Sequence, residues 1–321
     1  MRRREFITLI GAAAIWPFAA RAQQRPRISI LHSGFPRLTP IHLLFEALDK
    51  LGYQDGRTAE IDLLGAEGDP GRLKALVAQL GAQKPDVVIA ITSPAVLALK
   101  EARLTIPVVF AFVSDPVGLA IVESFAHPGG NFTGVTYSEA VLGGKRLELL
   151  IDAISGIRRV AVLWSPFFPG NAAALDSIRV AASTRGITVF SREFRDLEDL
   201  APAFDDAKRA GSQAAVFMTD NVMFGHRKRV AELAMTHLLP TIHTFPPEVR
   251  DGGLMFYGPS NAENYQRAAA LANRILKGAR PSELPVEQPT KFELIINLKT
   301  AKALGLAIPE AFLLRADEVI E

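Results

Sequence analysis

Hydrophobic positions follow two alternating patterns along the chain after residue 24. Short runs rich in Val and Ile recur, and between them lie longer stretches with apolar residues every three or four positions. The runs predict buried strands, and the longer stretches predict amphipathic helices. Strands are predicted at residues 28–31, 86–92, 107–113, 159–164, 188–191, 214–219 and 240–243. Helices are predicted at residues 41–51, 71–83, 94–102, 144–154, 171–185, 197–210 and 223–237.

The alternation predicts an α/β protein with two doubly wound parallel-sheet lobes. A Pro-Gly-Gly-Asn turn at residues 128–131 separates the first series from the second. Two later strand-helix pairs follow, and we expect the chain to return to its first lobe there. The predicted lobe I comprises residues 26–136 plus about 258–290, and lobe II comprises residues 137–257 plus about 291–321. Lobes joined by such crossings form a hinge with a ligand cleft between them.

The first 22 residues predict an export signal peptide. Three arginines, Arg2 to Arg4, precede an apolar stretch that ends in Ala20-Arg21-Ala22, a small-x-small cleavage site. The paired arginines before Glu5-Phe6 are typical of twin-arginine (Tat) export. Residues 7–20 are too few to span a bilayer, which needs about 20 apolar residues. We therefore expect a periplasmic protein that begins near Gln23.

Composition narrows the class of the mature protein. Without residues 1–22 the chain has 32 Lys+Arg against 33 Asp+Glu, so no net positive charge favours nucleic acid. The chain has no cysteine, which excludes disulfides, thiolate zinc sites and a lipidated cysteine. The six histidines lack metal-site spacing. We expect a soluble monomer without a lipid anchor, metal or cofactor.

Several blocks of the chain resemble one family. These are Ser-Asp-Pro-Val-Gly at 114–118, Pro-Gly-Gly-Asn-Phe-Thr-Gly at 128–134, Gly-Lys-Arg-Leu-Glu-Leu-Leu at 144–150, residues 285–293 and residues 315–321. Together they resemble the TrpX-type family of ABC-transporter substrate-binding proteins. The resemblance implies a type I periplasmic-binding-protein fold, capture of a small solute, and delivery to an ABC permease and ATPase in the inner membrane. It also implies a carboxylate-bearing ligand, with an aromatic amino acid or a related compound as the candidate.

Enzyme motifs are missing from the sequence, and no catalytic residue is predicted. There is no G-x-S-x-G elbow, no G-x-G-x-x-G after the first strand and no P-loop. Two other functions remain open. One is a binding protein that presents its ligand to a membrane sensor, and the other is an exported α/β enzyme.

Polar residues after buried strands are the candidate ligand contacts in lobe I, because open α/β sheets bind ligands at the carboxyl ends of strands. Ser33 and Gly34 follow the first strand, Thr92 and Ser93 open a helix, and Ser114 and Asp115 follow the next strand. Free N–H groups at a helix start attract a carboxylate. Simple helix capping is the alternative role, and it is favoured for Asp115.

Candidate contacts in lobe II follow the same rule. Asp220 and Asn221 end a strand, and the Asp220 carboxylate would accept from a ligand ammonium, with helix capping as the alternative. Phe168 and Asn171 lie in another loop after a strand, where Phe168 would stack on a flat ligand or pack on the core. Tyr137 and Tyr257 lie near the expected lobe crossings, with the same two alternatives.

Overall fold

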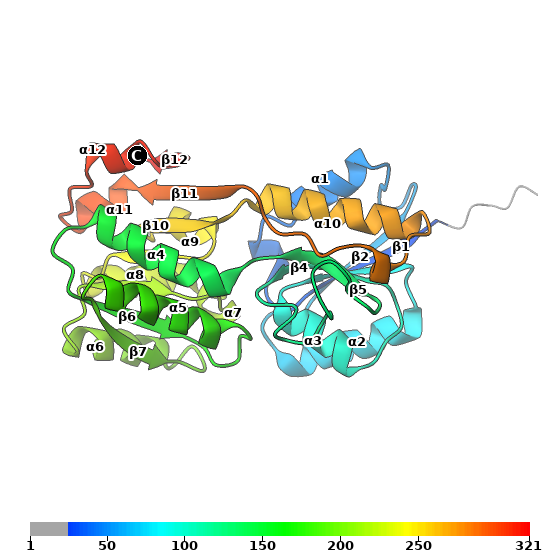
Figure 1. The fold of residues 1–321 in the computed structure, drawn as a ribbon, viewed down its shortest axis with the longest axis horizontal. Helices are drawn as coiled ribbons and strands as arrows, with labels where there is room; N and C mark the ends of the chain where they lie inside the picture. Colours follow the sequence, from blue (N-terminus) through cyan, green and yellow to red (C-terminus); the bar gives the residue numbers. More distant parts are fainter. Residues whose placement is uncertain (1–24) are drawn as a thin grey trace, which may run out of the picture.

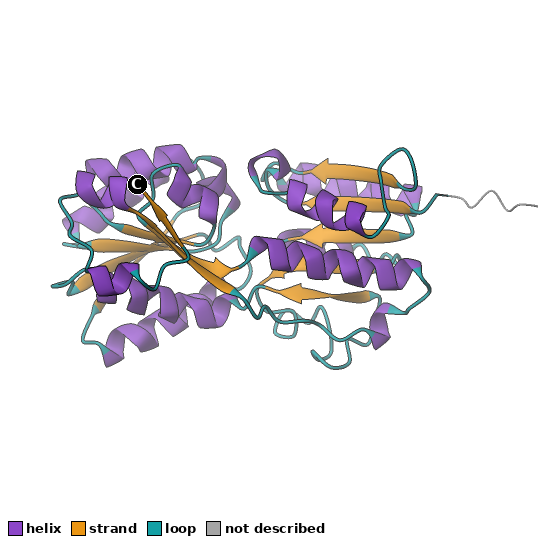
Figure 2. Cartoon of the chain, turned by 90° about the horizontal axis from the view of Figure 1, so that it is seen from above, coloured by secondary structure: helices purple, strands orange, loops and turns teal. Residues whose placement is uncertain are grey.

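The protein folds into two α/β lobes that lie side by side along its long axis in a computed structural model (Figure 1). The structure describes residues 25–321, so the predicted signal peptide lies outside the described residues. Figure 2 shows the strands of each lobe gathered into one sheet, with helices against it.

The first lobe is built on a five-stranded parallel sheet with the order β2-β1-β3-β4-β5. Its strands are β1 (Arg27–His32), β2 (Glu60–Gly65), β3 (Val87–Ile91), β4 (Val108–Val113) and β5 (Phe132–Thr136). Its helices are α1 (His42–Lys50), α2 (Pro70–Gln83), α3 (Ser93–Glu101) and the much later α10 (Asn261–Leu276), with short 3-10 turns at Pro36–Leu38 and Pro281–Glu283.

Both faces of this sheet are covered by apolar side chains, which explains the continuous apolar runs in β3 and β4. Ile30 and Ile89 face one core, where they meet α1 and residues of α10 such as Tyr265. Leu31 and Val88 face a second core beneath α2 and α3. Helix α10 therefore belongs to the first lobe by packing, although it is more than a hundred residues from β5 in sequence.

The second lobe is built on a seven-stranded sheet with the order β12-β11-β10-β9-β8-β6-β7. Its strands are β6 (Arg159–Trp164), β7 (Thr188–Glu193), β8 (Ala214–Phe217), β9 (Thr241–His243), β10 (Met255–Pro259), β11 (Phe292–Asn297) and β12 (Glu318–Ile320). Its helices are α4 (Glu139–Ala153), α5 (Asn171–Thr184), α6 (Leu200–Arg209), α7 (Asn221–Gly225), α8 (Arg227–Thr236), α9 (Pro246–Arg250), α11 (Leu298–Ala303) and α12 (Glu310–Leu313).

The chain passes between the lobes at three places. It leaves the first sheet after β5, returns between β10 and α10, and passes back before β11. Strand β11 runs antiparallel to β10, whereas the other pairs of this sheet are parallel. The antiparallel pair arises because the chain travels into lobe I and back between these two strands.

Three strands were not predicted from the hydrophobic pattern. β2 is an edge strand, and its side chains are at most half-buried. Its sequence therefore lacks the continuous apolar run by which the buried strands were recognised. β5 contains Gly134, where a Cβ atom would lie 2.1 Å from the carbonyl oxygen of Phe110. β12 has three residues, all half-buried.

Within residues 25–321, no helix combines the length and the apolar character that crossing a bilayer requires.

Candidate ligand-binding site

A cavity lies between the lobes, at the carboxyl ends of the strands of both sheets. Lobe I and lobe II both contribute to its lining, as the resemblance to a two-lobed binding protein implies. The lining residues of lobe I are His32, Thr39, Pro40, Ile91, Thr92, Phe112, Asn261 and Tyr265. Those of lobe II are Thr219, Asp220, Asn221, Phe224 and Phe245.

On the lobe I side the cavity meets the start of α3. Thr92 directly follows β3 and has a left-handed φ of +79°, a costly conformation for a β-branched residue. Its hydroxyl lies 2.6 Å from the hydroxyl of Ser33. Helix α3 has no side-chain cap, and the first N–H groups of any helix have no partner within the helix. Thr92 lines the cavity directly before this helix start, a position at which free N–H groups favour an anion such as a carboxylate.

On the lobe II side the cavity meets the Asp220 carboxylate. Asp220 follows β8, and its Oδ1 accepts from the Met223 backbone N–H at 2.9 Å, so it caps α7. Burial raises the pKa of this carboxyl above its ordinary value, while backbone N–H groups of α7 act in the opposite direction. Asp220 is the single Asp, Glu, Lys or Arg among the cavity-lining residues. A cationic group of a ligand would be its natural partner.

Aromatic side chains form the walls of the cavity. The rings of Phe112 and Tyr265 meet edge to face at 5.1 Å between centroids, and those of Phe224 and Phe245 meet edge to face at 5.4 Å. Phe112 and Phe245 belong to different lobes, and their centroids are 6.4 Å apart. Such rings favour a flat apolar group by offset or edge-to-face contact.

Polar contacts cross between the lobes around the cavity. The Asn221 side-chain amide donates to the Ser33 hydroxyl at 3.1 Å. Tyr137, in the crossing segment after β5, packs in the lobe I core, and its hydroxyl donates to the Thr244 carbonyl oxygen of lobe II. At another point Gly170 lies against Ser114, because a Cβ atom built on Gly170 would be 2.6 Å from the Ser114 Cβ. The structure thus has its two lobes closed against each other.

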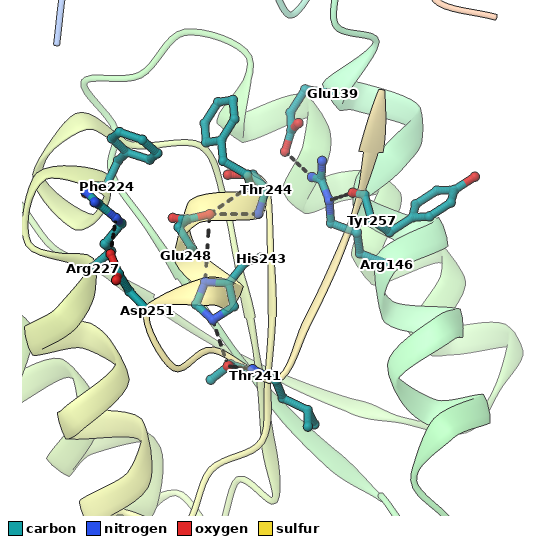
Figure 3. Close-up of polar contacts among 12 residues, drawn as sticks. Glu139, Arg146, Phe224, Arg227, Thr241, His243, Thr244, Glu248, Asp251 and Tyr257 are labelled. Atoms are coloured by element: carbon teal, nitrogen blue, oxygen red, sulfur yellow. Dashed lines mark hydrogen bonds and ion pairs between the residues drawn. The ribbon is translucent and has the colours of Figure 1, made fainter. Parts of the chain in front are cut away.

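A buried polar network supports the lobe II wall (Figure 3). The Glu248 carboxylate accepts from the backbone N–H groups of Thr244 and Phe245, at 3.1 and 2.8 Å. Burial raises the pKa of Glu248 to about 7. Nearby on α4, Arg146 forms a buried ion pair with Glu139 and donates to the Tyr257 carbonyl oxygen. The Glu248 contacts hold the backbone of Phe245 in the wall, and the side chains of Glu248, Arg146 and Glu139 do not line the cavity themselves.

Known proteins share this architecture. A family model described as "ABC transporter substrate binding protein" matches residues 37–320. The chain belongs to this family.

Three relatives of this substrate-binding protein illustrate the family. A tyrosine-binding protein of Clostridioides difficile (strain R20291) is 26% identical over 262 residues, which cover 81% of this chain and 75% of that one. A crystal structure of a conserved domain protein from Vibrio cholerae has a TM-score of 0.87 at 25% identity, over 92% of this chain and all of that chain. The ABC domain in complex with L-Trp from Streptococcus pneumoniae has a TM-score of 0.84, with the same identity and coverage.

Seven of the sequence-predicted residues come together at the lobe interface of this substrate-binding protein. Thr92, Asp220 and Asn221 line the cavity. Ser33 and Phe168 line a neighbouring groove that shares Asp220 and Asn221. A Cβ atom on Gly34 would contact the Asn221 amide at 2.6 Å, and Ser114 faces Gly170.

The structure places the other five away from the cavity lining. Ser93 is buried, and its hydroxyl accepts from the Ser114 N–H. Asp115 does not cap a helix but accepts from the Gly118 N–H in a turn, at 2.8 Å. Asn171 donates to the carbonyl oxygens of Ser165 and Thr219, and so ties two loops together. Tyr137 packs behind Phe112 and Phe245. Tyr257 stacks on Phe292.

Several cavity residues were not predicted as contacts. Asn261 and Tyr265 lie on α10, which follows β10 in sequence but packs on lobe I. Phe112 is the last residue but one of β4, and its left-handed φ of +58° accompanies a shift in the strand register. His32 ends β1. The position of His32 at the end of a buried strand was a usable signal, whereas the others depend on tertiary packing.

Proposed function

We propose that this substrate-binding protein works in the periplasm, where it binds an aromatic amino acid or a close relative and delivers it to an ABC importer. The observation that supports this most strongly is the make-up of the cavity. Its lining combines a residue at the uncapped start of α3, a single buried carboxylate and several aromatic rings from both lobes. A zwitterion with a flat side chain complements all three features.

Two relatives agree with this ligand class, since one is named a tyrosine-binding protein and the structure of the other was solved with L-Trp. Closure would bring Asp220 of lobe II to a ligand seated on lobe I. Because the closed form presents a different surface from the open form, occupancy would be signalled to the permease.

The charge of the site makes the ligand test specific. Asp220 is the sole formal charge among the lining residues, so a ligand without a cationic group would leave it buried and unpaired. We expect the mature chain to bind L-tryptophan or L-tyrosine in titration calorimetry. Tryptamine, which keeps the ammonium, should bind more tightly than indole-3-propionate, which keeps only the carboxylate. Failure to bind any aromatic amino acid at millimolar concentration would refute the proposed ligand class.

Export can be tested separately. Arg3 and Arg4 belong to the proposed Tat-like signal. We expect the Arg3→Lys, Arg4→Lys double variant to remain as a precursor in the cytoplasm, as measured by cell fractionation and N-terminal sequencing. Normal processing at Gln23 in that variant would show that the general export route suffices.

A further inference from the structure

His32 ends β1, and its imidazole lines the interlobe cavity although the residue is only 4% exposed. The Gly34 backbone N–H donates to its Nδ1 at 2.9 Å. A neutral imidazole has one accepting nitrogen and one donating nitrogen. Because Nδ1 accepts, the proton of the neutral ring is on Nε2.

The ring is neutral at pH 7. Burial lowers the pKa of His32 to about 4, and no opposite charge offsets the cost of burial. The titratable side chains that share the cavity are Asp220 and Tyr265. No hydrogen bond to Nε2 occurs within the part of the chain that the structure describes. His32 therefore presents to the cavity an N–H donor that has no protein partner, from which a ligand oxygen can accept.

This donor lies on the same side of the site as the start of α3. β1 and β3 are neighbours in the sheet, and His32 is in register with Ile91. The ring consequently lies at the same sheet edge as Thr92 and the first turn of α3. Asn221, next to the Asp220 carboxylate, is also close, since its amide faces Gly34.

We propose that His32 is a ligand-binding residue that donates from Nε2 to a carboxylate oxygen of the ligand. The inference rests on the proposed function, because it requires a ligand that carries a carboxylate. The carboxylate is then held by neutral donors, His32 and the first N–H groups of α3. The single formal charge of the site, on Asp220, is left for the ammonium group.

Two variants distinguish the acceptor role of Nδ1 from the donor role of Nε2. His32→Asn keeps an acceptor for the Gly34 N–H but loses the donor to the ligand, whereas His32→Gln keeps a donor near the Nε2 position. With L-tryptophan as the probe in titration calorimetry, we expect about a 10-fold loss of affinity for His32→Asn, the effect of one hydrogen bond to a charged acceptor. We expect His32→Gln to recover most of that loss. The exposed His127→Asn variant is the control, and its affinity should stay unchanged.

Nitrogen NMR of the histidine rings gives a second readout that a purely structural role would not move. We expect the His32 Nε2–H resonance to shift on addition of L-tryptophan, with Nδ1 remaining an acceptor. Unchanged affinity in a folded His32→Asn variant, or no shift of this resonance in a complex that forms, would overturn the role of His32 alone. A wild-type protein that binds neither L-tryptophan nor L-tyrosine would overturn the proposed function and this inference together.

Discussion

At the scale of single residues, Asp220 has two roles that one substitution can separate. Its side chain caps α7, and its carboxylate is the sole formal charge of the cavity lining. Asn caps a helix about as well as Asp, so Asp220→Asn should fold normally. The variant loses the charge-assisted contact to the ammonium, and we expect L-tryptophan to bind about 1.5–3 kcal/mol more weakly in titration calorimetry.

The control for this prediction is Asp196→Asn. Asp196 is exposed and, like Asp220, accepts from the backbone N–H of the residue three positions later, but it lies outside the cavity lining. Its affinity should match that of the wild type. If Asp220→Asn also matched, Asp220 would be a helix cap and no more.

Gly170 offers a residue-scale test of closure. It has a left-handed φ of +96°, and an added Cβ would lie 2.6 Å from the Cβ of Ser114 on the facing lobe. Gly170→Ala should therefore disfavour the closed form and weaken binding of L-tryptophan by about 5-fold or more, because ligand shifts the population toward closure.

Gly156→Ala is the matched control for Gly170→Ala. Gly156 also has a left-handed φ, +82°, but an added Cβ would meet nothing within 4 Å. Both variants carry backbone strain of about 1–2 kcal/mol, and only Gly170→Ala contacts the other lobe. Thermal unfolding should show similar losses of stability for the two variants. Equal binding would mean that Ser114 moves aside without cost.

At the scale of elements, α4 is attached to its surroundings through Arg146. The guanidinium is fully buried, pairs with Glu139 on the same helix and donates to the Tyr257 carbonyl oxygen on β10. Removing one partner of a buried pair leaves the other charge uncompensated. We expect Arg146→Met to lower the free energy of unfolding by about 3–5 kcal/mol in urea titration.

Lys145→Met tests whether this effect depends on burial. Lys145 pairs with Glu148 at 3.1 Å, but the two side chains are 45% and 36% exposed. Exposed pairs contribute little, so the loss should be below about 1 kcal/mol. A similar loss in both variants would mean that the buried pair has no special weight in holding α4.

At the scale of the whole molecule, buried titratable groups predict how stability changes with pH. Burial lowers the pKa of His32 to about 4 and that of His243 to about 3. Both histidines are neutral in the folded protein. Their contribution to the free energy of unfolding is therefore present above pH 6.5, their pKa in the unfolded chain, and is lost as the pH falls below it. Burial raises the pKa of Glu248 from 4.5 to about 7. Its contribution to the free energy of unfolding is therefore present below pH 4.5 and is lost as the pH rises through 7.

Between pH 6.5 and 4 the two histidines favour a fall in the free energy of unfolding as the solution is acidified, and Glu248 and Asp220, whose pKa values burial raises, oppose that fall. His243→Gln should reduce this fall by on the order of 1–2 kcal/mol in urea titrations at pH 7 and pH 4.5. His127→Gln, at an exposed histidine, should leave the fall unchanged. A fall that His243→Gln does not alter would place the acid sensitivity elsewhere.

Local patterns in the sequence determined the layout of the lobes. Continuous apolar runs such as Val87–Ile91 lie in the interior of a sheet, and a run buried on both faces needs no tertiary information to be recognised. The same reasoning placed Thr92 and Asp220 correctly at the ends of strands, because a polar residue between a buried strand and a helix start has few other positions. Export remains a prediction from the residues before Gln23.

Only the tertiary structure decided which residues share the cavity. Tyr265 and Asn261 reach it because α10 buries its apolar face on lobe I, a choice made by packing between segments far apart in sequence. Asp115 follows a strand as Asp220 does, yet it accepts from Gly118 in a local turn. Edge strands such as β2 are half-exposed and leave a weak pattern. Periodicity records which face of an element is buried, whereas the partner of that face is set by contacts that no local pattern contains.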